Sequence, residues 1–528
     1  MQTISGVAHG PLRRVVVTLS IVFIAGCASL PAPVARPAEH AFAAPQATAL
    51  GKHVLSMAPA PDASGFRVLL AGEDAFGALK VLIDGAQDSL DLQYYLVRDE
   101  ISARNLLRRV YKAAASRGVK VRLLVDDLNT AGEEDLLLCL ADQRGVEVRL
   151  YNPFPSGRFS TLSRVVASAT DVSRISARMH NKMLVADNAI AVTGGRNLGD
   201  AYFVQSKQSN FLDLDLLVAG PVVRKLSTSF DAFWNSELAY PISALIKRKP
   251  VCIGPDPVRA NGTGEEPAAQ VPPAPNELPA DAIHLEQELQ HGKVALTWAP
   301  ATLLADKPSK ITSEGKPARS ETVSDDIAQL LQSAQQEVII ISPYFVPGTR
   351  GVALFETLRK RGVKVRVLTN SLAATDAPAV HIGYSRYRPG LLQMGVELYE
   401  LRPQLGSPDS SVGQFGSSHA SLHAKALVID RSVVLIGSMN MDPRSANLNS
   451  EIGLVLRAPS IADQLVRLYT DVTKRSSYHV ELSDGYRLRW STNEKPDGPT
   501  YYDTEPDANP GLRFMLWMLS PLAPEEML

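Results

Sequence analysis

Two stretches of this sequence decide its fold, because they are near copies of each other. Residues 178–187 have the sequence RMHNKMLVAD, and residues 422–430 have the sequence LHAKALVID. After six further residues, the first continues with GGRN at 194–197 and the second with GSMN at 437–440. Both copies share the pattern His-x-Lys-x4-Asp-x6-Gly-[Gly/Ser]-x-Asn. Two matches to so long a pattern indicate a duplicated unit rather than chance.

The repeat extends outward from these stretches. RGVKVR at 117–122 recurs at 361–366, and GVE at 145–147 recurs at 395–397, in the same order. Helical periodicity alternates with apolar, strand-like runs in both copies. The predicted helices are 72–88, 103–116, 324–336 and 352–361, and the predicted strands are 89–97, 119–125, 146–150, 338–342 and 363–368. This alternation predicts an α/β fold with a largely parallel or mixed sheet covered by helices.

Composition narrows the class of protein. The 528 residues are 45% hydrophobic, which excludes a mainly disordered chain. Lys and Arg number 54 against 55 for Asp and Glu, so bulk charge disfavours binding to nucleic acid. Three cysteines exclude a disulfide framework. No cluster has zinc-ligand spacing, and lysine is not a ligand, so no metal is expected.

The repeated His and Lys carry the candidate chemistry. The apolar run after each pair predicts a strand, so a His and a Lys two residues apart share one face of it. A half-buried lysine needs a counter-charge, which a bound phosphate would supply. The glycines are expected to let the backbone approach a ligand. The candidate catalytic residues are His180, Lys182, Asp187, His423, Lys425 and Asp430. The two aspartates begin turns and are expected to support the motif geometry rather than touch substrate.

The amino terminus predicts export. Arg13 and Arg14 precede an apolar run at 15–24 that ends at Cys27. Residues 1–26 are therefore predicted to be a lipoprotein signal peptide, with lipid attached to Cys27. An ordinary secretory signal and an uncleaved anchor helix are the alternatives. Export would leave Cys139 and Cys252 in an oxidising space, where they could pair, although the apolar run around Cys139 also suits a buried thiol.

Composition shifts along the chain suggest its domain layout. The expected parts are an Ala/Pro-rich tether at 27–60, a first lobe at 61–252, a Pro-rich linker at 253–283, a second lobe at 284–480 and a tail at 481–528. Within the tail, 512–519 is an apolar segment too short to span a bilayer. Its Trp and Arg suit a membrane interface, and a helix docked on the core is the equal alternative.

The doubled motif resembles the phospholipase D superfamily, and its surroundings resemble bacterial cardiolipin synthases of the C type. The resemblance rests on the two motifs, on GGRNLGD at 194–200 and on GSMNMDPRS at 437–445, and it covers about 65–250 and 295–475. It implies two α/β/α sandwich lobes with one active site at their pseudo-twofold interface. It also implies a phosphohistidine intermediate without a cofactor or metal.

The resemblance assigns roles to individual residues. It implies that His180 is the nucleophile and His423 the acid and base, although the near-identical motifs do not distinguish them. It further implies that the two lysines bind the phosphate together with Asn197, Asn440 and Ser438. Each histidine then needs a carboxylate beside the ring nitrogen that points away from the substrate. Aligning the segments after the two motifs places Asp213 opposite Glu451, with Asp215 as an alternative and edge-strand charges as the non-functional interpretation.

The expected function is phosphatidyl transfer that forms cardiolipin from two phospholipids. The resemblance points to phosphatidylglycerol, and to phosphatidylethanolamine as a second substrate, at a membrane surface and without nucleic acid. The alternatives are a phospholipase D-type hydrolase, a periplasmic nuclease or phosphodiesterase, and an inactive membrane-binding lipoprotein. The expected location is the bacterial cell envelope, anchored by lipid and facing the periplasm. Ala28 favours the outer membrane over the inner one. Head-group preference and oligomeric state stay open.

Overall fold

The computed structural model describes the two repeated units and most of their surroundings. The described residues are 30–31, 36–130, 132–154, 172–250, 252, 287–289, 291–312, 322–404, 419–495 and 498–520. The expected signal peptide, Cys27 and the expected linker at 253–283 lie outside them. None of the helices in the described ranges combines the length and apolar character needed to cross a membrane.

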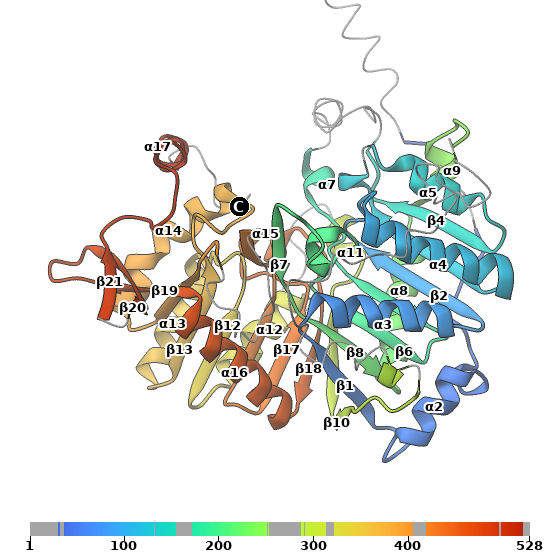
Figure 1. Cartoon of the computed structure of the whole chain (residues 1–528), viewed down its shortest axis with the longest axis horizontal. Coiled ribbons are helices and arrows are strands. Elements are labelled where there is room, and N and C mark those ends of the chain that lie inside the picture. The colour runs from blue at the N-terminus through green and yellow to red at the C-terminus, as the bar shows by residue number, and fades with distance from the viewer. Residues whose placement is uncertain are drawn as a thin grey trace, which may run out of the picture.

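The first lobe is built on a nine-stranded sheet (Figure 1). Its strands lie in the order β10 (Thr297–Ala299), β1 (Ser64–Leu69), β8 (Asp215–Ala219), β6 (Ile190–Gly194), β5 (Met183–Ala186), β2 (Ser89–Tyr94), β3 (Lys120–Asp126), β4 (Val146–Tyr151) and β9 (Ala239–Pro241). Strands β2, β3 and β4 are parallel, and the other pairs are antiparallel. The prediction of a mixed sheet is therefore confirmed.

The second lobe repeats this plan in a ten-stranded sheet. Its strands lie in the order β11 (Ala301–Ala305), β18 (Ile452–Arg457), β17 (Val433–Gly437), β16 (Ala426–Ile429), β12 (Glu337–Ile341), β13 (Lys364–Asn370), β14 (Glu397–Leu401), β19 (Ser477–Leu482), β20 (Leu488–Lys495) and β21 (Gly498–Tyr502). From β11 to β19 the order and strand directions match those from β1 to β9. This match confirms the duplication.

Helices cover both faces of each sheet. The outer helices of the first lobe are α3 (Gly72–Gly85), α4 (Ile101–Arg117) and α5 (Glu134–Ala141), and those of the second are α12 (Val323–Gln332), α13 (Gly348–Lys360) and α14 (Pro378–Gln393). The inner helices are α8 (Val222–Trp234) and α16 (Pro459–Arg475). Both inner helices are amphipathic, and their apolar faces join one core that contains residues of both lobes. The two lobes are therefore packed together by a shared hydrophobic interior.

Shorter elements connect these layers and surround the joint between the lobes. They are η1 (Pro45–Ala47), α2 (Ala49–Met57), η2 (Asp127–Asn129), α7 (Val172–Ser176), η3 (Asp200–Phe203), β7 (Ser209–Leu212), α9 (Ile242–Leu245), α11 (Ser309–Thr312), β15 (His419–Leu422), α15 (Pro443–Asn447) and α17 (Pro510–Leu519). Strands β7 and β15 come from different lobes and pair in parallel.

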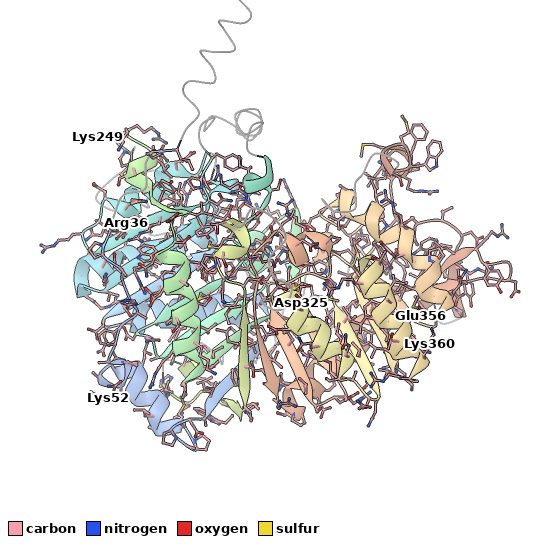
Figure 2. All side chains as sticks on the ribbon, turned by 180° about the vertical axis from the view of Figure 1, so that it is seen from behind. Arg36, Lys52, Lys249, Asp325, Glu356 and Lys360 are labelled. Atoms are coloured by element: carbon pink, nitrogen blue, oxygen red, sulfur yellow. A yellow bond between two sulfur atoms is a disulfide. The ribbon has the colours of Figure 1, made fainter. Side chains whose placement is uncertain are left out.

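The structure differs from the expected domain layout in two places. Residues from Arg36 onward, expected to be a tether, pack on the first lobe. Arg36 (Figure 2) donates to the Ala239 carbonyl at 2.6 Å. Val54 of α2 is buried. Part of the expected tail continues the second lobe, since β20 and β21 extend its sheet beyond β19. Backbone pairing and apolar burial hold both segments, and neither is visible as a motif in the sequence.

Cys139 and Cys252 form a disulfide across 113 residues of sequence. Cys139 lies in α5 and is 2% exposed. The pairing that the sequence left open is therefore present, and it ties the end of the first repeat to its outer helix layer.

Candidate active site

The two motifs meet where the lobes join. The His180 amide donates to the Ser450 carbonyl at 3.0 Å, and the Ser450 amide donates to the Arg178 carbonyl. On the other side, the His423 amide donates to the Leu212 carbonyl at 2.7 Å, at the end of the β7–β15 pair. Each motif is thus hydrogen-bonded to the segment of the other lobe that precedes a carboxylate.

Each histidine pairs with a carboxylate of the opposite lobe. His180 Nδ1 lies 2.9 Å from Glu451 Oε2, and His423 Nδ1 lies 2.5 Å from Asp213 Oδ2. The carboxylates are fully buried, and the histidines are 7% and 6% exposed. A carboxylate on Nδ1 orients the ring and leaves Nε2 for the substrate. Asp215, the alternative to Asp213, instead forms an ion pair with Arg196 at 3.2 Å.

Aromatic side chains surround both imidazoles. The ring of Tyr95 meets His180 edge-on, with centroids 5.0 Å apart. Tyr202 and Phe211 pack on His423 with centroid distances of 5.3 and 5.0 Å. None of these three residues belongs to the repeated motif, so the motif did not predict them. For Tyr95 a signal existed, because it directly follows β2, and ligand sites of open α/β sheets lie beyond the carboxyl ends of parallel strands.

The two motif lysines are buried, and neither forms an ion pair with a carboxylate of the described residues. Lys182 and Lys425 are each 1% exposed, and each Nζ donates to the carbonyl of its own motif histidine. Among the described residues, no carboxylate oxygen lies within salt-bridge distance of either ammonium. Burial lowers the pKa of Lys182 well below its ordinary value and lowers the pKa of Lys425 to about 8. An anionic phosphodiester beside them would restore the ammonium forms.

The electrostatic environments of the two histidine pairs differ. Burial and the charge of Lys182 hold the pKa of His180 well below its ordinary value, and Lys425 and His423 of the other lobe add to this. Burial and Lys425 also lower the pKa of His423, but Asp213 opposes the shift. Burial raises the pKa of Glu451 to about 7. Burial also works to raise the pKa of Asp213, yet His423 and Lys425 hold it below its ordinary value.

Of the predicted phosphate-binding residues, Asn440 alone has an unsatisfied polar atom. Its Oδ1 is buried and has no partner among the described residues. Asn197 Oδ1 accepts from the Leu96 amide, and its Nδ2 donates to the Tyr202 hydroxyl at 3.0 Å. Ser438, which the sequence predicts to bind phosphate, is fully buried, and its hydroxyl donates a hydrogen bond to Glu451.

The motif glycines make room for protein rather than for a ligand. A Cβ on Gly195 would lie 2.0 Å from Asp213 Oδ1, and one on Gly437 would lie 2.2 Å from the Ile452 carbonyl oxygen. Gly195 and Ser438 occupy the same motif position. In the first lobe, the glycine at this position has no side chain, which leaves room for the Asp213 carboxylate. In the second lobe, the Ser438 hydroxyl at the same position donates a hydrogen bond to the Glu451 carboxylate.

The motif aspartates lie at the turns that follow β5 and β16. Asp187 (φ 53°) accepts hydrogen bonds from the backbone amides of 87–89, and Asp430 (φ 48°) accepts from those of 335–337. Each carboxylate thereby ties its motif to the start of the neighbouring central strand. Among the described residues, no group of three or more His, Cys, Asp or Glu side chains could hold a metal ion.

Comparison with known proteins agrees with this geometry. Residues 79–234 and 327–471 match the family described as "Cardiolipin synthase, PLD-like domain". The chain belongs to the phospholipase D-like cardiolipin synthase family. Cardiolipin synthase C of Escherichia coli (strain K12) is 38% identical over 435 residues, covering 81% of this chain and 89% of that protein. The cardiolipin synthase of Geobacillus kaustophilus (strain HTA426) is 26% identical over 430 residues, or 81% and 69% of the two chains.

A solved structure supports the fold of this cardiolipin synthase family member. The crystal structure of phosphatidylserine synthase from Haemophilus influenzae Rd KW20 aligns with 91% of this chain and 100% of its own, with a TM-score of 0.56 and 11% identity. The predicted fold and superfamily are both confirmed. The protein is a phosphatidyltransferase of the phospholipase D superfamily.

Proposed function

We propose that this phosphatidyltransferase forms cardiolipin from two phospholipids through a phosphohistidine at His180. The observation that carries the proposal is the meeting of two His-Lys pairs from opposite lobes, with a carboxylate on the Nδ1 of each histidine. Phosphoryl transfer by double displacement needs a nucleophile, a separate acid and base, and positive charge for the nonbridging oxygens. These groups supply all three.

The first displacement would use the histidines in different protonation states. A nucleophile must be neutral, and the pKa of His180 lies well below its ordinary value because of burial and Lys182. His180 Nε2 would attack phosphorus while Nδ1–H donates to Glu451. His423 would carry a proton on Nε2 and pass it to the departing alcohol oxygen: burial and Lys425 lower its pKa, but Asp213 on Nδ1 opposes that shift, so its protonated form is less disfavoured than that of His180. The phosphorus–oxygen bond to the alcohol breaks as the phosphorus–nitrogen bond forms.

The second displacement would reverse these roles. The incoming lipid hydroxyl gives its proton to His423 Nε2 and attacks phosphorus, and His180 leaves. Lys182 and Lys425 would hold the nonbridging oxygens through both steps, with Asn440 as a further donor through its Nδ2 amide group. Phosphatidylglycerol supplies the hydroxyl of the acceptor, and phosphatidylglycerol or phosphatidylethanolamine supplies the phosphatidyl group.

Transfer competes with hydrolysis, because water also attacks a phosphohistidine. The burial and aromatic lining of the histidines favour transfer, since they limit the access of water. Purified protein in phosphatidylglycerol liposomes is expected to yield cardiolipin. Dilution into detergent should shift the product toward phosphatidic acid, because the local concentration of acceptor falls.

Mass spectrometry of both products tests this proposal. Phosphatidic acid as the sole product in dense liposomes with both lipids present would favour the hydrolase. Cleavage of a nucleic acid without a lipid product would favour the nuclease. His180→Ala and His423→Ala should each lose more than about 1,000-fold of the activity. A single variant that keeps activity within about tenfold, or about 1.4 kcal/mol in barrier terms, would exclude the paired-histidine mechanism.

The proposed location is the cell envelope, with lipid on Cys27 after removal of residues 1–26. The apolar run at 15–24 and the small residues before Cys27 support this proposal, and Ala28 favours the outer membrane over the inner one. Cells labelled with palmitate should yield labelled wild-type protein. Cys27→Ala should be unlabelled and should keep its precursor length. Label on the Cys27→Ala protein would place the lipid elsewhere and contradict the proposal.

A further inference from the structure

Helix α17 exposes an unusual concentration of apolar side chains. Phe514, Met515, Trp517 and Met518 are 61%, 47%, 72% and 57% exposed. They are half of the large exposed hydrophobic residues within the described ranges, and they fall within five positions. The helix stands at the margin of the second lobe, clear of both sheets (Figure 1, Figure 2). Burial of one such side chain contributes about 1.5–3 kcal/mol of free energy, so this exposed surface favours binding to another apolar surface.

The helix is held firmly although it buries little of itself. Leu516 packs with Leu372 and Ile382 in a small apolar cluster. Ahead of the helix, Glu505 pairs with buried Arg388 and accepts a hydrogen bond from His381 Nε2 at 3.1 Å, and Asp507 accepts from the Tyr478 hydroxyl. Asn509 caps the first turn through the Gly511 amide at 2.8 Å. The chain thus presents these apolar residues on a fixed support.

The residues that pack beneath α17 are connected to the active site through strand β13. Leu372, under the helix, belongs to the segment between the end of β13 and the start of α14, and Ile382 lies within α14. Asn370, at the end of β13, exchanges two hydrogen bonds with the backbone of Leu422, the residue before His423. The segment also contains Asp376, which accepts from the Tyr344 hydroxyl at 2.9 Å, and its charge acts on His423 and Lys425. Helix α17 is therefore connected to the His423 side of the site through Leu372 and Asn370.

We infer that α17 is a membrane-docking helix that inserts Phe514, Met515, Trp517 and Met518 into the interfacial region of a phospholipid bilayer. The inference rests on the proposed function for the identity of the lipid substrate. With 10 residues the helix is about 15 Å long, too short to span and suited to lie in the surface. Tryptophan and phenylalanine favour that region. Docking there holds the His423 side of the site against the lipids that must enter it.

Tryptophan quenching in proteoliposomes tests the insertion directly on the full chain. Of the four tryptophans, Trp517 is the one in α17, while Trp234 and Trp490 are buried and Trp298 is half-buried. Phosphatidylglycerol with brominated acyl chains should quench the wild type, and Trp517→Phe should lose most of that quenching. A tryptophan at Ile101, which is 73% exposed in the first lobe, is the matched control in the Trp517→Phe background. Ile101→Trp is expected to stay unquenched.

A second measurement connects docking to activity. Phe514→Ser/Trp517→Ser should lower lipid transfer in liposomes at least about tenfold and leave turnover of a monomeric short-chain phosphatidylglycerol unchanged. Ile101→Ser/Tyr486→Ser, at equally exposed sites, should change neither rate. Loss of turnover on the short-chain lipid would mean damage to the site and contradict a docking role.

Two further outcomes would overturn the inference. The first is a Trp517 that brominated lipid does not quench. The second is a dimer in sedimentation that Phe514→Ser/Trp517→Ser dissolves, because α17 would then face a second copy of the chain. Quenching of Trp517 in a protein that forms no cardiolipin would remove the proposed function and leave the docking helix standing.

Discussion

At the scale of single residues, the two histidine pairs have equivalent positions but different electrostatics. Asp213 is held in its ionised form by His423 and Lys425, whereas burial raises the pKa of Glu451 to about 7. Glu451 also accepts from the Ser438 hydroxyl, for which the first lobe has Gly195. An ionised partner favours a protonated imidazole more than a partner that is only partly ionised at neutral pH. This difference supports His423 as the acid and His180 as the nucleophile, which the near-identical motifs alone do not distinguish.

Replacement of the two carboxylates by amides should separate their roles. Asp213→Asn removes the charge that raises the pKa of His423, so that pKa falls and less of the acid form remains at neutral pH. Activity should drop about 100-fold or more, and the alkaline limb of the pH–rate profile should move to lower pH. Glu451→Gln changes the charge little below pH 7, so its loss at pH 6 should be about tenfold or less.

Profiles of kcat/KM between pH 5 and 9, with thermal unfolding of each variant as the control, make this comparison. An equal or larger loss in Glu451→Gln, with an unmoved alkaline limb in Asp213→Asn, would exchange the roles of the two pairs.

At the scale of elements, each motif is a strand, a turn and a strand, fastened by one aspartate. Asp187 accepts from three consecutive amides that lead into β2, at distances of 2.8–3.1 Å. Asp430 does the same for the amides that lead into β12. Both aspartates have positive φ, a conformation that Asp tolerates better than most residues. The carboxylates therefore place the histidine-bearing strands relative to the sheet without reaching the reacting phosphorus.

Asp187→Ala should act on stability before chemistry. Three buried or half-buried amides lose a charged acceptor, so we expect the free energy of unfolding to fall by about 3 kcal/mol. Urea unfolding measures this loss, and Asp142→Ala, at an exposed position after α5, serves as the control. Well below its melting temperature, Asp187→Ala should keep activity within about tenfold of the wild type. An unchanged unfolding curve with activity lost would give Asp187 a direct part in the reaction.

At the scale of the whole molecule, neither lobe contains a complete site. The carboxylate of each histidine comes from the other lobe, and one hydrophobic core includes residues of both. The joint is further defined by the parallel pairing of β7 with β15 and by the bridge between Met179 and Ser450. Catalysis therefore depends on how the two repeats dock.

The disulfide between Cys139 and Cys252 should stabilise the first lobe measurably. It closes a loop of 113 residues, for which loss of chain entropy in the unfolded state gives about 4–5 kcal/mol. Cys139→Ser/Cys252→Ser should melt at a lower temperature than the wild type, and reductant should lower the wild type to the same value. A variant and a reduced wild type that both melt like the oxidised protein would show that the bond contributes nothing.

Much of the fold could be predicted because its signals are local. The periodicities of 72–88 and 103–116 predicted α3 and α4, and the apolar run at 119–125 predicted β3, each within a few residues. The added strands β20 and β21 and the packing of residues 36–57 were missed. Edge strands of mixed polar and apolar residues and short packed segments have no period that distinguishes them from loops.

The sequence by itself determined the duplication, the α/β class, the superfamily and the candidate residues, because a repeated motif and its spacing are preserved in the order of the chain. Only the tertiary structure decided which groups act together. His180 meets Glu451, 271 residues away, and His423 meets Asp213, 210 residues away, because the backbone of each motif is hydrogen-bonded to a segment of the other lobe. The tertiary structure also decided that Asp215 forms an ion pair with Arg196, that Ser438 donates a hydrogen bond to Glu451 and that α17 exposes its apolar side chains. Such pairings depend on how two sheets pack, and no local pattern in the chain encodes them.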